Sequence, residues 1–265
     1  AGGLVLEYKT DAQDVCVYES DLECLQDGCW LNDVCINLWL TKLYETAVPG
    51  EWKDRVLLVD PAVVSFLRFQ CDAEDLEDFA TEHCLRDKVA VLVPVNDVEG
   101  LLDPSQQGTH WSLLVFYPRA RLFHHFDSTA SDANASAAQA TADRLWEAFC
   151  GDSTRFSKGH TPPVESMRHV TPTQQNGFDC GVYVLCVAEF LLQRMPLVLS
   201  PAAADFPEVA SAEEEPPAPA VAAGTIPCAV PPDALEDMRL EISSRTATAK
   251  RGEILGFIRD SAGGG

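Results

Sequence analysis

Three short polar stretches of the sequence carry the residue types that thiol catalysis needs. In chain order they contain His110 within Gly-Thr-His-Trp-Ser, Asp127 within Phe-Asp-Ser, and Cys180 at the end of Gln-Gln-Asn-Gly-Phe-Asp-Cys. Such catalysis combines a sulfur nucleophile, an imidazole that holds its proton and a carboxylate that orients the imidazole. The sequence therefore predicts a cysteine hydrolase with His110, Asp127 and Cys180 as its catalytic residues.

The segment that begins at Cys180 predicts how the nucleophile is presented. A polar loop ends there, and the apolar residues that follow, through Arg194, predict a largely buried helix. A thiol at a helix N-terminus beside an imidazolium has its pKa lowered from ~8.5 to about 3.5–7.5. Either Gln174 or Gln175 could supply a side-chain N–H to an oxyanion, with the backbone N–H of Cys180 as second donor. A structural cysteine such as Cys186 rarely follows so polar a loop.

Two apolar segments predict how the histidine and the aspartate meet. His110 begins the first segment, residues 110–117, and Asp127 ends the second, residues 122–127, after a short turn. If the segments pair as antiparallel strands, the start of one lies beside the end of the other. This geometry predicts a hydrogen bond between His110 and Asp127. Two further histidines lie inside the second segment and are predicted to be structural, namely His124 and His125.

The charge balance excludes one class of partner. The 265 residues carry a net charge of −22, and residues 1–105 hold 22 acidic against 7 basic side chains. A nucleic-acid surface needs a basic face, so no nucleic-acid partner is expected. An acidic half suits a protein partner with a basic patch, or serves solubility alone. No apolar run approaches the ~20 residues that span a bilayer, so no membrane association is expected.

The ten cysteines do not suggest a disulfide framework. No signal peptide opens the sequence, and several cysteines stand in apolar patterns, which predicts reduced thiols in the cytoplasm and/or the nucleus. Four cysteines lie close together in sequence, but their irregular spacing and the lack of a nearby histidine argue against zinc. They are Cys16, Cys24, Cys29 and Cys35. Neither a metal nor another cofactor is expected.

The composition changes once along the chain. Residues 200–232 contain eight prolines and five acids but no lysine or arginine, which predicts a disordered insertion. Residues 1–199 and 233–260 are predicted to form one domain, and residues 261–265 a flexible tail. Apolar spacing and end signals predict the remaining elements. The predicted strands are 4–6, 56–59, 89–95 and 164–170, and the predicted helices are 33–47, 61–68, 73–84, 133–149, 233–242 and 247–259.

These motifs resemble those of the Ulp/sentrin-specific family of cysteine proteases, which remove ubiquitin-like modifiers. Trp30-Leu31-Asn32-Asp33 is similar to the family's Trp-Leu-Asn-Asp motif, and the three catalytic stretches follow in family order and spacing over about residues 20–195. Lys250-Arg251-Gly252-Glu253, Phe123–Asp127 and the aromatic Phe178 resemble the branch that acts on the Nedd/Rub modifier.

The resemblance implies a fold and a role for each site residue. The fold is α+β and papain-like, with a central mixed sheet flanked by helices and the catalytic cysteine at the N-terminus of a buried helix. Gln174 is assigned to the oxyanion hole. Trp30 and Trp111 are expected to enclose a channel so narrow that only a Gly-Gly tail fits. Asp33 could pair with the arginine that precedes Gly-Gly in such modifiers, or could simply stabilise the first turn of its helix.

The resemblance also implies a function. The expected enzyme cleaves after the C-terminal Gly-Gly of a ubiquitin-like modifier, with Nedd/Rub and conjugates such as cullins as partners, and acts as a monomer. A SUMO-specific protease is the first alternative. An inactive modifier-binding module is an alternative of another class, and acyl transfer to a small donor is a third.

Overall fold

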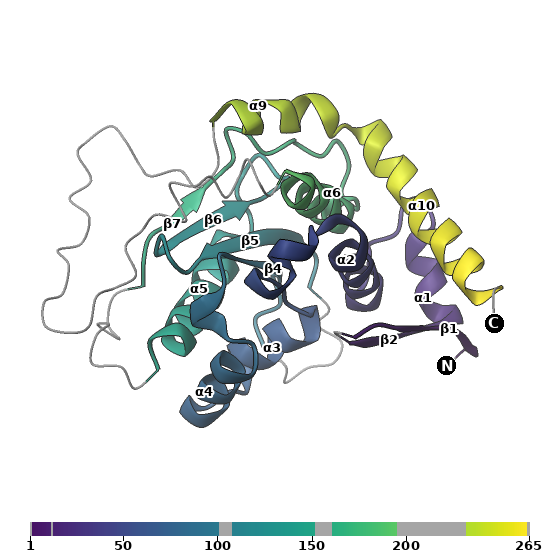
Figure 1. The fold of residues 1–265 in the computed structure, drawn as a ribbon. Coiled ribbons are helices and arrows are strands. Elements are labelled where there is room, and N and C mark those ends of the chain that lie inside the picture. The colour runs from purple at the N-terminus through teal and green to yellow at the C-terminus, as the bar shows by residue number, and fades with distance from the viewer. Residues whose placement is uncertain (1, 12, 101–107, 152–160, 195–231, 264–265) are drawn as a thin grey trace, which may run out of the picture.

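A mixed five-stranded sheet forms the centre of the molecule (Figure 1). The computed structural model describes residues 2–11, 13–100, 108–151, 161–194 and 232–263. The strands, in their order across the sheet, are β3 (Val56–Leu58), β4 (Ala90–Asn96), β5 (Trp111–Tyr117), β6 (Leu122–Phe126) and β7 (Val164–Ser166). β3 is parallel to β4 and β7 to β6, whereas β5 is antiparallel to both neighbours. The predicted α+β class with a central mixed sheet is confirmed.

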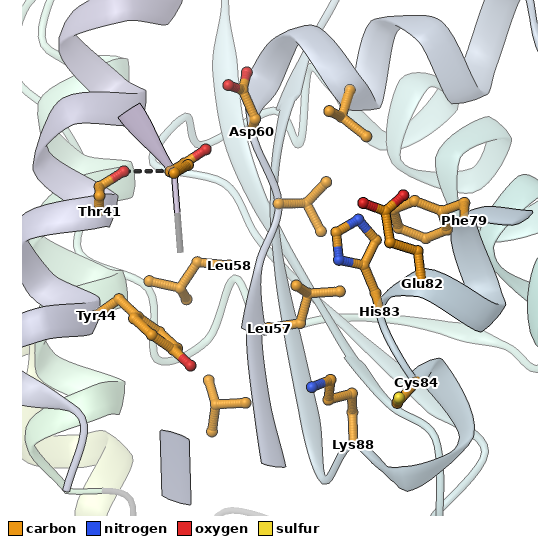
Figure 2. Close-up of a pocket in the computed structure, with 14 residues that line it drawn as sticks. Thr41, Tyr44, Leu57, Leu58, Asp60, Phe79, Glu82, His83, Cys84 and Lys88 are labelled. Carbon is orange, nitrogen blue, oxygen red and sulfur yellow. Dashed lines mark hydrogen bonds between the residues drawn. The ribbon is translucent and has the colours of Figure 1, made fainter. Parts of the chain in front are cut away.

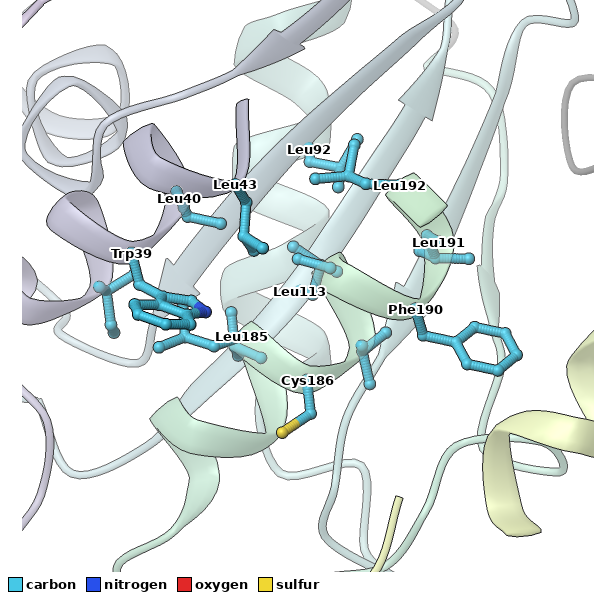
Figure 3. Packing of buried hydrophobic residues seen from close by; sticks show 14 of the residues in the cluster. Trp39, Leu40, Leu43, Leu92, Leu113, Leu185, Cys186, Phe190, Leu191 and Leu192 are labelled. Atoms are coloured by element: carbon cyan, nitrogen blue, oxygen red, sulfur yellow. The ribbon is translucent and has the colours of Figure 1, made fainter. Parts of the chain in front are cut away.

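Helices cover both faces of this sheet. One face is covered by α2 (Asp33–Ala47) and α6 (Cys180–Gln193), with α10 (Ser244–Ala262) packed against α6. The other face is covered by α3 (Pro61–Phe69) and α5 (Ala135–Cys150), with α4 (Ala73–Glu82) packed against α5. Each face of the sheet has its own hydrophobic core, the first on the side of α2 and α6 and the second on the side of α3 and α5. Successive residues of β4 point into different cores: Leu92 lies in the first and Val93 in the second. In Figure 3, Leu92 and Leu113 of the sheet face Leu43 of α2 and Leu192 of α6. The apolar run of β4 is therefore buried on both faces, as predicted.

Side-chain caps explain where α2 and α3 begin. The Asn32 side chain accepts a hydrogen bond from the backbone N–H of Cys35 at 2.9 Å, which confirms the predicted start of α2 at Asp33. Asp60 caps α3 in the same way, and Pro61 occupies the first helical position.

The sequence predicts the N-terminal region incompletely. The predicted strand at residues 4–6 is the start of a longer β1 (Leu4–Lys9), which pairs antiparallel with β2 (Asp14–Tyr18). The short α1 (Glu19–Leu22) and the 3-10 helix η1 (Glu23–Leu25) follow. The hairpin packs on α2 and α10, and its short strands alternate buried and exposed residues over too few positions to give a strong pattern.

Several predicted boundaries differ from those of the structure; for example, the helices predicted at 73–84, 133–149 and 247–259 are Ala73–Glu82, Ala135–Cys150 and Ser244–Ala262. The strand predicted at 164–170 ends at Ser166, because the N–H groups of Val170 and Thr171 both donate to the carbonyl of Met167 and close a turn. Ser261 and Ala262, which were predicted to belong to a flexible tail, are the last residues of α10. The predicted insertion loses Pro232 to α9 (Pro232–Glu241), and residues 200–231 of it lie outside the described residues.

Two further observations bound the search for a site. No helix within the described ranges is long and apolar enough to cross a bilayer. A hollow of about 300 Å³ lies between α2 and the region of β3 and α4, where Tyr44, Leu58, His83 and Lys88 are among its lining residues (Figure 2). None of the predicted site residues lines it.

Candidate active site

The register of β5 and β6 brings the predicted histidine and aspartate together. Leu113 faces Phe126 across the pair, so the residue before β5 and the residue after β6 lie at one end of it. His110 Nε2 lies 2.7 Å from Asp127 Oδ1, and both side chains are buried. A carboxylate only accepts hydrogen bonds, so the ring donates through Nε2 and turns Nδ1 the other way. The predicted hydrogen bond is confirmed.

Asp127 is held by three further groups that sequence reasoning missed. Its Oδ1 accepts from the backbone N–H and the hydroxyl of Thr129, both at 2.8 Å, and its Oδ2 accepts from the backbone N–H of Asn134 at 3.0 Å. Burial alone would raise the pKa of Asp127, but the bond to His110 and these N–H donors lower it to about 2. Asp127 is therefore a carboxylate throughout the neutral range.

A buried polar network stands behind Asp127. The Asn134 side chain donates to the carbonyl of Val95 at 2.8 Å and to Ser112 Oγ at 2.9 Å. Ser112 Oγ lies 2.9 Å from His125 Nε2, and His125 Nδ1 lies 3.2 Å from Asp132 Oδ1. Burial lowers the pKa of His125, so the neutral ring donates to Asp132 and accepts from Ser112. His125, predicted to be structural, is part of the support of the site.

The other predicted structural histidine stays apart from the site. His124 is fully buried, and its ring packs edge-on against Tyr117. Burial lowers the pKa of His124 to about 4, so the ring is neutral.

The backbone before His110 is fixed by an aspartate that sequence reasoning also missed. Asp97 Oδ1 accepts from the N–H groups of Thr109 and His110 at 2.6 and 3.0 Å. Gly108 passes so close to Asn96 that a Cβ there would lie 1.5 Å from its side-chain oxygen. Only glycine allows this approach, so the Gly-Thr-His stretch is positioned by the end of β4.

Cys180 begins α6 and meets the free side of the imidazole. It is 1% exposed and forms a side-chain hydrogen bond with His110. Burial opposes a charge on the ring, but the hydrogen bonds to Asp127 and Cys180 outweigh it and raise the pKa of His110 to about 10. The charged ring therefore lies directly beside the sulfur at the N-terminus of α6.

The loop before Cys180 distinguishes the two candidate glutamines. The amide oxygen of Gln174 accepts from Ser128 Oγ at 2.6 Å, and its amide nitrogen donates to the carbonyl of Asn176 at 2.7 Å. An amide NH₂ has two N–H groups, so one remains for an oxyanion. Gln175 is exposed, and its side chain donates to the carbonyl of Thr173. Gln174, adjacent to the residue that follows Asp127, is the glutamine that the loop orients.

The two tryptophans are each anchored by a hydrogen bond from the indole N–H group. Trp30 is 51% exposed, and its Nε1 donates to the carbonyl of Gly177 at 2.6 Å. Trp111 donates through Nε1 to the carbonyl of Leu31 at 3.0 Å. A Cβ on Gly181 would lie 3.4 Å from the Trp111 ring, so this indole lies beside the start of α6. Trp30 is thus bonded to the loop before Cys180, and Trp111 lies beside the residue that follows it.

Asp33 is the predicted site residue with the fewest constraints. It is exposed at the first position of α2, three residues after Trp30. It forms no hydrogen bond or ion pair with any other described residue, so both of its predicted roles, in substrate binding and in stabilising the helix, fit.

Three ligand-type side chains lie close enough to share an ion. They are His125, Asp127 and Asp132, whose ligand atoms are all within 4.8 Å of one another. Asp127 and the His125–Asp132 pair already use these atoms in the hydrogen bonds above. The four clustered cysteines do not form such a group within the described ranges, and all nine described cysteines are free thiols. Two of them, Cys16 and Cys84, are exposed rather than buried.

Comparison with known proteins identifies the family. The model of the Ulp1 protease family, C-terminal catalytic domain, matches residues 29–210. The chain belongs to this family. It is accordingly a cysteine peptidase, and the predicted catalytic stretches at 108–112, 126–128 and 174–181 all lie inside the match.

Individual relatives agree with this assignment. NEDD8-specific protease 1 of Arabidopsis thaliana is 33% identical over 181 residues, which cover 68% of this chain and 74% of the relative. Human sentrin-specific protease 8 is 31% identical over 190 residues, which cover 72% and 82%. A crystal structure of the C-terminal Ulp1 protease domain in complex with Smt3, the yeast ortholog of SUMO, has a TM-score of 0.57 over 99% of this chain and 89% of that one at 15% identity, which shows the shared fold.

The His110–Asp127 pair predicts a pH dependence of stability. The pKa of Asp127 falls from 3.8 to about 2 on folding, so its contribution is present above about pH 4 and is lost as the pH falls through 2. The pKa of His110 rises from 6.5 to about 10, so its contribution is full below pH 6.5 and is lost as the pH rises through 10. We expect the Asp127→Asn variant to be less stable than wild type by about 2 kcal/mol between these limits. Urea unfolding from pH 2.5 to 9.5 measures the difference, which should shrink on both sides; a constant difference contradicts the assignment.

Trp111 predicts a loss of substrate positioning. Trp111→Ala removes the indole beside Gly181, and we expect kcat/KM for a Gly-Gly substrate to fall about 100-fold. Trp146→Phe, in the second core, is a control for loss of a buried indole remote from the sulfur. Steady-state kinetics and thermal melts distinguish the two effects. Normal kinetics with a lower melting temperature in Trp111→Ala would make Trp111 a packing residue only.

Proposed function

We propose that the protein is a thiol protease that cleaves after the C-terminal Gly-Gly of a ubiquitin-like modifier. The observation that carries this proposal is the hydrogen-bonded line Cys180–His110–Asp127 beside two anchored indoles. The relatives named above are proteases of such modifiers by name. Flat aromatic walls beside the nucleophile favour residues without a Cβ, which two glycines provide.

The first chemical step uses the thiolate and the oxyanion donors. The sulfur of Cys180 attacks the carbonyl carbon of the last glycine, and the carbonyl oxygen takes the negative charge. The second amide N–H of Gln174 and the backbone N–H of Cys180, one of the unpaired donors at the start of α6, stabilise this oxyanion. Loss of one such donor typically costs about 10²–10³ in rate.

The second step uses the proton of His110. The imidazolium protonates the leaving nitrogen, a lysine amine or a peptide nitrogen, as the C–N bond breaks and a thioester forms. The neutral imidazole then takes a proton from water, whose oxygen attacks the thioester and releases the glycine carboxylate and the thiol. Asp127 keeps Nε2 of the ring occupied throughout, so that Nδ1 faces the reaction.

Nedd/Rub is the modifier that we propose as substrate. Two relatives at 31% and 33% identity are a sentrin-specific protease 8 and a protease specific for NEDD8 by name. The Lys250–Glu253 segment and Phe178 support the same branch. SUMO remains the second candidate, since a neighbour in fold was solved in complex with the yeast ortholog of SUMO.

The remaining partners follow from this proposal. Cullins and other proteins conjugated to Nedd/Rub would be the substrates of isopeptide cleavage, and the enzyme would act as a monomer. The nine free cysteines fit a reducing compartment, the cytoplasm and/or the nucleus.

A panel of C-terminal electrophiles tests the proposal. Nedd/Rub, SUMO and ubiquitin, each ending in Gly-vinyl sulfone, are incubated with the protein, and intact-mass spectrometry follows the adduct. We expect the Nedd/Rub probe to react fastest, at Cys180, and Cys180→Ala to form no adduct while remaining folded. Faster reaction with SUMO would favour the second candidate. A folded protein that reacts with no probe would be an inactive binding module.

The next prediction concerns recognition of the modifier's C-terminal tail by Asp33. Modifiers of the ubiquitin and Nedd/Rub type carry an arginine just before Gly-Gly, and a charge-assisted bond to Asp33 would contribute ~1.5–3 kcal/mol. We expect Asp33→Ala to lower kcat/KM for the Nedd/Rub tail about tenfold or more, which corresponds to at least ~1.4 kcal/mol.

A double-mutant cycle identifies the partner of Asp33. The Arg→Ala change in the tail is measured with wild-type enzyme and with Asp33→Ala, and the exposed Asp27→Ala serves as a charge-matched control. We expect the tail change to cost little extra once Asp33 is gone. Additive losses would mean that Asp33 does not contact that arginine and serves its helix.

A further inference from the structure

The C-terminal helix α10 carries a buried arginine that contacts the segments next to the active site. α10 runs beside α6 toward the N-terminal hairpin (Figure 1), and Arg251 lies on its buried side with 5% exposure. The family match ends at residue 210, so this arginine lies outside the matched residues. The mechanism above does not use it.

The Arg251 guanidinium joins two segments that are far apart in sequence. Its Nε and Nη2 donate to Asp179 Oδ1 at 3.0 and 2.8 Å. Its Nη1 donates to the carbonyls of Cys24 and Gln26 at 2.8 and 3.3 Å, and Nη2 donates to that of Cys29 at 2.7 Å. A guanidinium has five N–H donors in a rigid plane, and this set of acceptors occupies the whole fork.

Each segment leads directly to a residue of the active site. The carbonyls at positions 24–29 belong to the chain that continues into Trp30, and Asp179 precedes Cys180. The Trp30 indole N–H also bonds the carbonyl of Gly177 in the cysteine loop. Arg251 therefore ties together, from behind, the same two segments that border the approach to the sulfur.

The pair with Asp179 is costly to bury unless it is fully bonded. Asp179 is 3% exposed, and its second oxygen accepts from the Asn176 side chain at 2.8 Å. Removing one partner of such a pair leaves an uncompensated buried charge. A simpler cation does not replace Arg251, because an ammonium has three donors and no planar fork.

We propose that Arg251 is a positioning residue of this peptidase, which sets the spacing between the segment that carries Trp30 and the loop that carries Cys180. The proposal rests on the Gly-Gly cleavage proposed above. Because a shift of about 1 Å at such a site costs on the order of 100-fold in rate, the link affects catalysis as well as folding. α10 is thus part of the catalytic apparatus although it contributes no reacting group.

Lys250 provides a matched control on the same helix. It is also 5% exposed, and its Nζ bonds Glu189 of α6 at 2.6 Å and Glu253 at 2.5 Å. These partners lie outside both segments that Arg251 joins. Lys250→Met thus breaks a buried ion pair between α10 and α6 without touching the approach to the sulfur.

The experiment compares Arg251→Met, Arg251→Lys and Lys250→Met in the full chain. Three quantities are measured: the melting temperature, kcat/KM on a Nedd/Rub-tail substrate, and the rate at which iodoacetamide alkylates Cys180. We expect both Met variants to melt lower than wild type. We expect kcat/KM to fall about 100-fold in Arg251→Met and at least tenfold in Arg251→Lys, and to stay within threefold in Lys250→Met.

The alkylation rate distinguishes a disturbed thiol–imidazole pair from a change in the spacing between Trp30 and the loop that carries Cys180. Iodoacetamide needs the thiol–imidazole pair but not the spacing between Trp30 and the loop, so we expect its rate to stay within threefold in every variant. Arg251→Lys keeps a cation opposite Asp179 and provides the result if Arg251→Met does not fold. Activity of the Arg251 variants within threefold of Lys250→Met would overturn the proposal, as would a parallel fall in alkylation and cleavage. Wild-type activity on the tail tests the proposed function separately.

Discussion

In the antiparallel pair of β5 and β6, the short turn that ends at Arg121 sets a register in which Leu113 faces Phe126. That register puts the residue before β5 and the residue after β6 at one end of the sheet, and His110 meets Asp127 there at 2.7 Å. If the pairing of β5 and β6 shifted by one residue, side chains that pack in one core would point into the other. The two packed cores therefore fix the register. The rest of the site is built on this fixed pair.

The second half of the site is a loop whose polar groups are satisfied internally. Asn176 and Asp179 bond each other, and the Asn176 side-chain oxygen accepts from the N–H groups of Phe178 and Asp179. Gln174 is joined to Ser128, directly after Asp127, by a side-chain bond and a backbone bond. The loop is therefore attached both to the sheet, through Ser128, and to α10, through Arg251. A catalytic geometry held from two sides is pre-organised before substrate arrives.

The sequence predicts what depends on local pattern and chain order. The buried run of β4, the Asn32 cap and the polar lead-in to Cys180 each leave a signature over a few residues. The contacts of Arg251 leave none, although its segment resembles one of a known branch: the acceptors are mostly backbone carbonyls more than 220 residues away, and any residue type provides a carbonyl. The network behind Asp127 is hidden for a similar reason, since Ser112 and His125 stand in apolar strands where only the fold shows which side chains meet.

Two buried cysteines of α6 show that burial does not by itself make a nucleophile. Cys186 lies six residues, about 9 Å of helix rise, beyond Cys180 and belongs to the same buried cluster as Trp39 and Leu185 (Figure 3). Burial raises the pKa of Cys186 to about 12, so this sulfur stays a protonated thiol. Cys180 is buried to the same degree but stands at the N-terminus of the helix against the His110 imidazolium. The difference lies in the partners of the two sulfurs: Cys186 has charged neighbours of both signs, Lys250 and Glu189 among them, but only Cys180 is hydrogen-bonded to an imidazole. The positioning of His110 therefore determines the chemistry of the helix.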